Sequence, residues 1–109
     1  MMETHSAVKV LSVLAHEGRL SLLQVLVQAG EKGASVSTLA GALGQNVKTV
    51  SAQLQLMADA ELVRVRREGK QMIYSTRYAT LGGLFAFIMH DCCAGDEGLL
   101  RTVRRACSC

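Results

Sequence analysis

The chain has 109 residues, which suffices for one domain with a modest core and not for two. Half of the residues are apolar, yet no apolar run approaches the roughly 20 residues that a membrane-spanning helix needs. We therefore expect a single domain over residues 1–109 and no membrane partner. The net charge of +3 points to nucleic acid only if the positive charge is concentrated in one region.

The N-terminal stretch MMETHSAVKV lacks the charged and apolar regions of a signal peptide, which favours a cytoplasmic protein. Four cysteines in such a protein are more typical of thiols or metal ligands than of structural disulfides. All four fall in the last part of the chain, so we expect residues 92–109 to form a cysteine-containing segment that binds something thiophilic.

The spacing of apolar residues predicts two helices near the N-terminus, over Ala7–Ala15 and Gly18–Ala29, with Gly30 as the stop of the second. Each of the two helices carries an apolar stripe. The stripes consist of Val8, Leu11, Leu14 and Ala15 in the first helix, and of Leu20, Leu23, Leu26 and Val27 in the second.

Two further helices are predicted on either side of a tight turn. The third begins at Ser35 or Ser37 and ends before Gly44, which permits the turn. Asn46 is a good N-cap for the fourth helix, over Val47–Ala60. The residues expected to point inward from this fourth helix are Val50, Leu54 and Met57.

A basic β-hairpin is expected directly after the fourth helix. Leu62–Arg66 alternates apolar and charged residues, Gln71–Thr76 is rich in β-formers, and Gly69 supplies the positive φ of the turn. Cations crowd this stretch, namely Arg64, Arg66, Arg67, Lys70 and Arg77. Helix, turn, helix and basic hairpin in this order predict a mainly α fold of the winged helix-turn-helix type, which places one helix in the DNA major groove.

The polar side chains of the fourth helix and the hairpin are the candidate DNA contacts. Taken alone, the helix could be an ordinary amphipathic helix with a solvated face, but the cationic hairpin after it favours DNA. The expected contacts are Lys48, Thr49, Ser51, Gln53 and Gln55 from the helix, and Arg66, Arg67 and Lys70 from the hairpin.

Another apolar helical face follows the hairpin, and a short last helix is expected around Leu99–Val103, after the glycines Gly95 and Gly98. No Ser/His/Asp arrangement, carboxylate pair or phosphate-binding glycine loop is present, so we expect no enzyme. A redox enzyme is the least favoured class, because a Cys-Cys pair lacks the Cys-x-x-Cys spacing of thioredoxin-like proteins.

The segment VKTVSAQLQLMADAELVRVRREGKQMIYS resembles the recognition helix and wing of the ArsR/SmtB family of small repressors, and LAHEGRLSLLQVL resembles its second helix. The resemblance covers most of residues 10–91. It implies a homodimer formed by the first and fifth helices and bound to a palindromic operator. The chain departs from the family pattern at Ala52 and Gln53, so the resemblance does not imply an operator sequence.

The family resemblance also bears on the sensing site. The third helix lacks the Cys motif of many arsenic-responsive members, the fifth lacks the ligand spacing of zinc sensors, and the second lacks the cysteine of persulfide sensors. Adjacent cysteines near residue 92 resemble arsenic-responsive members with a site at the end of the fifth helix. The candidate ligands are Cys92, Cys93, Cys107 and Cys109.

Thiolates suit trivalent arsenic or antimony, and they also suit zinc or another soft metal. The expected function is thus a repressor released from DNA by a thiophilic inducer, most simply arsenite, methylarsenite or antimonite. The alternative is a thiol-based redox or sulfide/persulfide-sensing repressor of the same fold. A three-thiolate site needs Cys107 or Cys109 from a tail that loops back or from the partner subunit, whereas Cys92 and Cys93 alone would suit a methylated arsenical.

Overall fold

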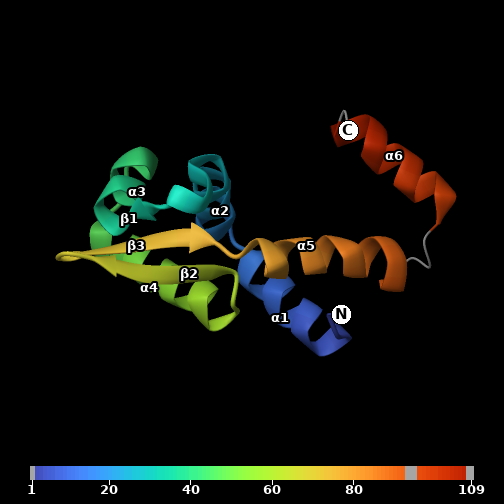
Figure 1. Cartoon of the computed structure of the whole chain (residues 1–109), viewed down its shortest axis with the longest axis horizontal. Helices are drawn as coiled ribbons and strands as arrows, with labels where there is room; N and C mark the ends of the chain where they lie inside the picture. The colour runs from blue at the N-terminus through green and yellow to red at the C-terminus, as the bar shows by residue number, and fades with distance from the viewer. Residues whose placement is uncertain (1, 93–95, 108–109) are drawn as a thin grey trace.

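The computed structural model describes residues 2–92 and 96–107, and Figure 1 shows their arrangement. Helices dominate, and a β-hairpin projects from one end of the body. The elements in chain order are α1 (Thr4–Leu14), α2 (Glu17–Ala29), the 3₁₀ turn η1 (Gly30–Lys32), β1 (Ala34–Ser35), α3 (Val36–Leu43), α4 (Val47–Asp59), β2 (Val63–Glu68), β3 (Gln71–Thr76), α5 (Tyr78–Ala86), the π-helical turn η2 (Phe87–Cys92) and α6 (Glu97–Cys107).

Side-chain caps fix where the central helices begin. The Nδ1 atom of His16 accepts from the amides of Gly18 and Arg19 at the start of α2. The hydroxyl of Ser35 accepts from the amide of Thr38, which decides between the two serines that could have capped α3. Helices α2 and α3 therefore begin within a residue of their predicted starts.

A three-stranded sheet anchors the wing, which we define as β2, β3 and the turn between them. The strand order is β1-β3-β2, and all pairing is antiparallel. The hairpin prediction is confirmed, with Gly69 at φ +64° in the turn. Strand β1 was not predicted; its two residues pair with β3 through Ala34↔Tyr74 and Ser35↔Ile73 and tie the wing to the helical body.

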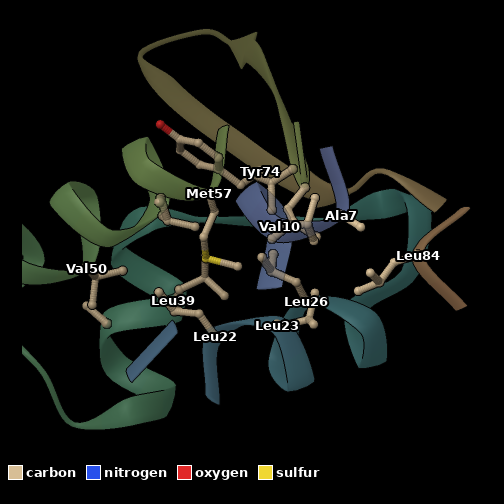
Figure 2. Close-up of a cluster of buried hydrophobic side chains, with 14 residues drawn as sticks. Ala7, Val10, Leu22, Leu23, Leu26, Leu39, Val50, Met57, Tyr74 and Leu84 are labelled. Carbon is tan, nitrogen blue, oxygen red and sulfur yellow. The ribbon is translucent and has the colours of Figure 1, made fainter. Parts of the chain in front are cut away.

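One hydrophobic core joins α1 to α5, and Figure 2 shows its side chains converging between the helices and the sheet. The predicted inward positions of α4 are confirmed, since Val50, Leu54 and Met57 are fully buried. The apolar stripes of the first two helices match the core only in part. In α1 the buried residues are Ala7 and Val10, outside the stripe, whereas in α2 Leu23 and Leu26 of the stripe are buried together with Leu22. The large exposed members of the stripes are Val8, Leu11, Leu20 and Val27.

The C-terminal part of the chain lies farthest from the helical body. Helix α5 continues into η2, and α6 is longer than the predicted Leu99–Val103. In Figure 1 the tip of the wing lies at one end of the longest axis, which measures 47 Å, and the far end of α5 lies toward the other end, where α6 stands apart from the other helices. No residue of α6 is buried.

Among the described residues, no single helix is long and apolar enough to span a bilayer. The stretches Thr4–Leu14 and Glu17–Lys32 reach the required length and hydropathy only as a pair, across a bend of 99°. Both stretches contribute side chains to the buried core.

Candidate nucleic-acid interface

The turn between α3 and α4 sets the angle at which α4 is presented. Gly44 ends α3 in the left-handed conformation, at φ +62°, and the amide of Gln45 donates to the carbonyl of Ala40 at 2.9 Å. The side chain of Asn46 then accepts from the amide of Lys48 at 2.7 Å and starts α4. The predicted helix-turn-helix geometry is therefore present, held by one left-handed glycine and one Asn cap.

The outer face of α4 is polar and exposed, while its inner face fills the core. Lys48, Thr49, Ser51 and Gln55 of the predicted contacts all lie on the exposed side. The amide of Gln55 donates to the carboxylate of Asp59 one turn later, at 3.2 Å. Four of the five helix residues predicted to contact DNA are thus accessible to a ligand, and their small or polar side chains allow close approach of the backbone to bases.

Gln53 differs from the other four predicted contacts because it is half-buried. Its amide nitrogen lies against Gly18, so close that a Cβ added there would be only 2.6 Å away. Its Oε1 atom is buried and has no hydrogen-bond partner among the described residues. In this conformation Gln53 packs α4 against the first turn of α2, and it would have to rotate outward to reach a base.

The wing places its cations in solvent beside the exposed face of α4. Arg64, Arg67 and Lys70 are exposed, and the Nε atom of Arg67 donates to the carbonyl of Gly69 at 3.1 Å, which holds its side chain over the turn. No acid contacts Arg67 or Lys70 in an ion pair of the described residues. These two side chains are therefore available to meet phosphate.

Arg66, by contrast, is bound within the protein. Its Nε atom pairs with the carboxylate of Glu68 at 2.7 Å, and its two terminal nitrogens donate to the carbonyls of Glu31 and Lys32 at 3.4 and 2.6 Å. The guanidinium thus joins β2 to η1, 34 positions earlier in the chain. Sequence reasoning grouped Arg66 with the DNA contacts; the structure gives it the geometry of a brace that fixes the wing, and no local signal in the sequence announces this role.

The predicted cysteine ligands are placed only in part. Cys92 is the last residue of η2, Cys107 is the exposed last residue of α6, and Cys93 and Cys109 lie outside the described residues. Among the described residues, no three His, Cys, Asp or Glu side chains come together in a way that could hold a metal ion. Eleven helical residues span about 16 Å, so Cys107 lies well away from the start of α6, which is the end that follows Cys92 in the chain.

Comparison with known proteins identifies the fold and the family. The family model HVO_A0114 matches residues 13–81, which is more than half of the chain. A curated relative, the HTH-type transcriptional regulator Rv0324 of Mycobacterium tuberculosis (strain ATCC 25618 / H37Rv), is 39% identical over 75 residues. That match covers 69% of this chain but 32% of the relative, so the chain spans about a third of the length of the curated protein it matches.

Two solved structures agree in both sequence and fold. The homodimeric winged helix-turn-helix DNA-binding domain of Mb0332 from Mycobacterium bovis, described as a possible ArsR-family transcriptional regulator, is 33% identical, with 78% of this chain and 76% of that one covered and a TM-score of 0.66. The antimony-specific transcriptional repressor AntR is 34% identical, with 79% and 77% covered and a TM-score of 0.65. With its helix-turn-helix, basic wing and these relatives, the chain belongs to the ArsR family of winged helix-turn-helix, DNA-binding transcription regulators.

Proposed function

We propose that this regulator is a homodimeric repressor that leaves a palindromic operator when a thiophilic inducer binds its cysteine segment. The observation that carries the proposal is the division of the molecule. An exposed polar helix and a cationic wing occupy one end, and the cysteine-bearing segment begins at the end of α5, at the other. The cytoplasmic location expected from the sequence stays a prediction.

Exposed apolar side chains on α1 and α5 support the homodimer. Val8 is 55% exposed and Leu11 is 44% exposed on α1, and Phe85 is 58% exposed on α5. Met2 lies 3.6 Å from the position of a Cβ at Gly83, so the start of α1 and the middle of α5 are neighbours. A two-fold dimer would cover these apolar surfaces and present two α4 helices to two half-sites, which requires a palindromic operator.

The contrast between Arg66 and Arg67 yields a test of the wing. Arg67→Ala should weaken binding to every DNA sequence and reduce the slope of log K against log salt by about 0.9, because one phosphate contact is lost. Arg66→Ala should also weaken binding but leave that slope unchanged, because its guanidinium holds Glu68 and two carbonyls and not phosphate. Anisotropy titrations against the DNA upstream of the gene, at several salt concentrations, measure both slopes.

Two comparisons complete this test. Arg66→Lys should not restore the parent affinity, since an ammonium cannot replace a guanidinium that reaches three acceptors at once. An equal loss of slope in the Arg66 and Arg67 variants would refute the brace. No binding at low salt by the reduced, metal-free parent would remove the DNA part of the proposal altogether.

The inducer is proposed from the chemistry of the donor set. Adjacent thiolates bind soft ions readily, whereas a disulfide between neighbouring cysteines is strained. The similarity to AntR, whose name marks it as antimony-specific, supports a trivalent metalloid as the inducer class. Cys107 is proposed as a further ligand, and because α6 is helical up to that residue, it would be supplied by the partner subunit or after α6 rearranges.

The cysteines are tested by substitution. Cys92→Ser and Cys93→Ser should each abolish the release of operator DNA by arsenite or antimonite, which in the parent should lower DNA affinity by about 5- to 150-fold. Affinity without inducer should remain at the parent value, which serves as the control. If both variants release DNA like the parent, the site assignment is wrong. If Cys107→Ser combined with Cys109→Ser behaves like the parent, a two-thiolate site is the better description.

A redox or persulfide sensor is the second candidate, favoured by the same cysteines. A further titration of the same complex, with a polysulfide or a thiol oxidant in place of the metalloid, distinguishes it from the metalloid-responsive repressor. Release by a polysulfide or by a thiol oxidant, without release by arsenite, selects the redox mechanism, because the signal is then carried by sulfur–sulfur bonds.

A further inference from the structure

Helix α6 has two sharply different faces. Leu99, Leu100 and Val103 recur at helical spacing on one side. The cationic side chains of the helix are Arg101, Arg104 and Arg105. Arg104 lies one turn after Leu100 and so borders the apolar face, whereas Arg105 lies on the opposite side.

Within the part of the chain that the structure describes, no other helix or strand packs closely on α6. No residue of α6 is buried, Val103 remains 36% exposed, and the helix stands apart from the body in Figure 1. An isolated helix of 11 residues is marginal in water, because too few propagated hydrogen bonds offset the cost of the first turn. We therefore expect α6 to be stabilised by a surface that binds its apolar face and its arginines.

The body of the protein offers a surface of complementary charge. A groove of about 920 Å³ runs between the start of α1, the end of α4 and the start of α5. Three carboxylates line it, from Glu3, Asp59 and Glu61, against a single lysine, Lys9. Its apolar floor includes Met2, Val10 and Ala60. The groove is thus acidic at its rim and apolar in part, which is the inverse of the basic, amphipathic α6.

We propose that α6 of each protomer lies in this groove of a second copy of the chain. The proposal rests on the homodimer argued above, because the groove borders the same α1 and α5 surfaces that would form its interface. Leu100 and Val103 would cover the apolar floor, and Arg104 would meet Glu3 or Glu61.

This docking would give α6 a regulatory position. Asp59 is the last residue of α4, and Glu61 follows two residues later at φ +59°. A helix seated beside them contacts the C-terminal end of the recognition helix of the other protomer. A ligand bound by the cysteines before α6 and at its end would then act, through α6, on α4 of the other protomer, the helix proposed to enter the DNA groove.

Hydrogen exchange read by mass spectrometry tests the docking without DNA or metalloid, so its outcome is independent of the inducer. In the reduced parent dimer, the amides of residues 97–107 should be protected. Arg104→Glu should lower that protection at least tenfold, since it faces the acidic groove. Arg105→Glu, which changes the charge equally on the opposite side of α6, is the matched control and should keep the protection.

Mixing two variants decides which protomer supplies the groove. A Glu3→Arg/Glu61→Arg chain should also lose protection of α6, because its groove is now basic. Mixed with the Arg104→Glu chain, both partners should regain protection, because each α6 then faces a groove of opposite charge across the dimer. The two α6 peptides differ in mass and are read separately. Glu3→Arg alone serves if the double variant does not fold.

Three results would overturn the proposal. The first is exchange of the α6 amides in the parent dimer at the rate of an unfolded peptide. The second is a mixture that stays unprotected, which would place α6 on its own protomer or on another surface. The third is an equal loss in the Arg105→Glu control.

Discussion

Gly33→Ala should lower the free energy of unfolding by about 2–5 kcal/mol, the largest loss of stability expected from adding one methyl group to this chain. Gly33 lies between η1 and β1 at φ +73°, a region that L side chains rarely adopt. A Cβ there would overlap the carbonyl oxygen of Tyr74 and press on the side chain of Ile73. Both neighbours belong to β3, so the methyl group would separate β1 from the wing strand it anchors. Urea unfolding followed by circular dichroism measures the loss.

Gly69→Ala is the matched control for this substitution. Gly69 also has a left-handed φ, of +64°, but no described atom lies within 4 Å of its added Cβ. Only the conformational cost remains, about 1–2 kcal/mol. If the two variants are destabilised equally, steric overlap at β1 contributes nothing, and the two-residue strand is not the anchor described above.

Ser51→Glu should reduce operator affinity by about 100-fold or more, because like charges brought together in an interface cost several kcal/mol and each 1.4 kcal/mol is a factor of ten. Ser51 is exposed on the outer face of α4, where a carboxylate would face the phosphates and base edges of the major groove. The fold should be unaffected, since the position makes no core contact. Anisotropy titration gives the affinity, and a thermal melt checks the fold.

The control for Ser51→Glu carries the same added charge elsewhere. Gln24→Glu lies on the exposed face of α2 and is nearly isosteric. Its effect should be confined to the small change that one unit of net charge brings to a long-range attraction. Equal losses for the two variants would mean that overall charge, and not the placement of α4 in the groove, governs binding.

The central part of the fold could be predicted because single residues determine where its helices and its hairpin turn begin and end. Asn46 and Gly44 set the helix-turn-helix, and Gly69 sets the hairpin turn, each through local backbone chemistry. Strand β1 could not be predicted because two residues are too few to show an alternation of apolar and polar side chains. Their pairing with β3 also depends on a segment some 40 positions away. The apolar stripe read in α1 does not mark its inner face, and that of α2 does so only at Leu23 and Leu26, since each helix has more than one apolar stripe.

The candidate site likewise contains residues whose placement follows from the sequence and residues whose placement does not. The exposure of predicted contacts such as Lys48 and Ser51 follows from the helical wheel, because the opposite face of α4 must fill the core. Gln53 and Arg66 could not be placed from the sequence. Gln53 reaches Gly18 only because α2 crosses α4 there, and Arg66 finds carbonyls of η1 only once β1 has drawn that turn against the wing. Both roles depend on tertiary contacts that no local pattern encodes.

The connection between β3 and α5 has a mechanical consequence for the dimer. A single residue, Arg77, separates the end of β3 at Thr76 from the start of α5 at Tyr78, and its amide is held by the carbonyl of Leu62 at 2.8 Å. One residue leaves little freedom between the strand and the helix. In the proposed homodimer, a rotation of α5 against its partner helix would therefore be passed directly to the wing. An inducer that reorients α5 would need no separate route to the DNA, because the backbone itself transmits the movement.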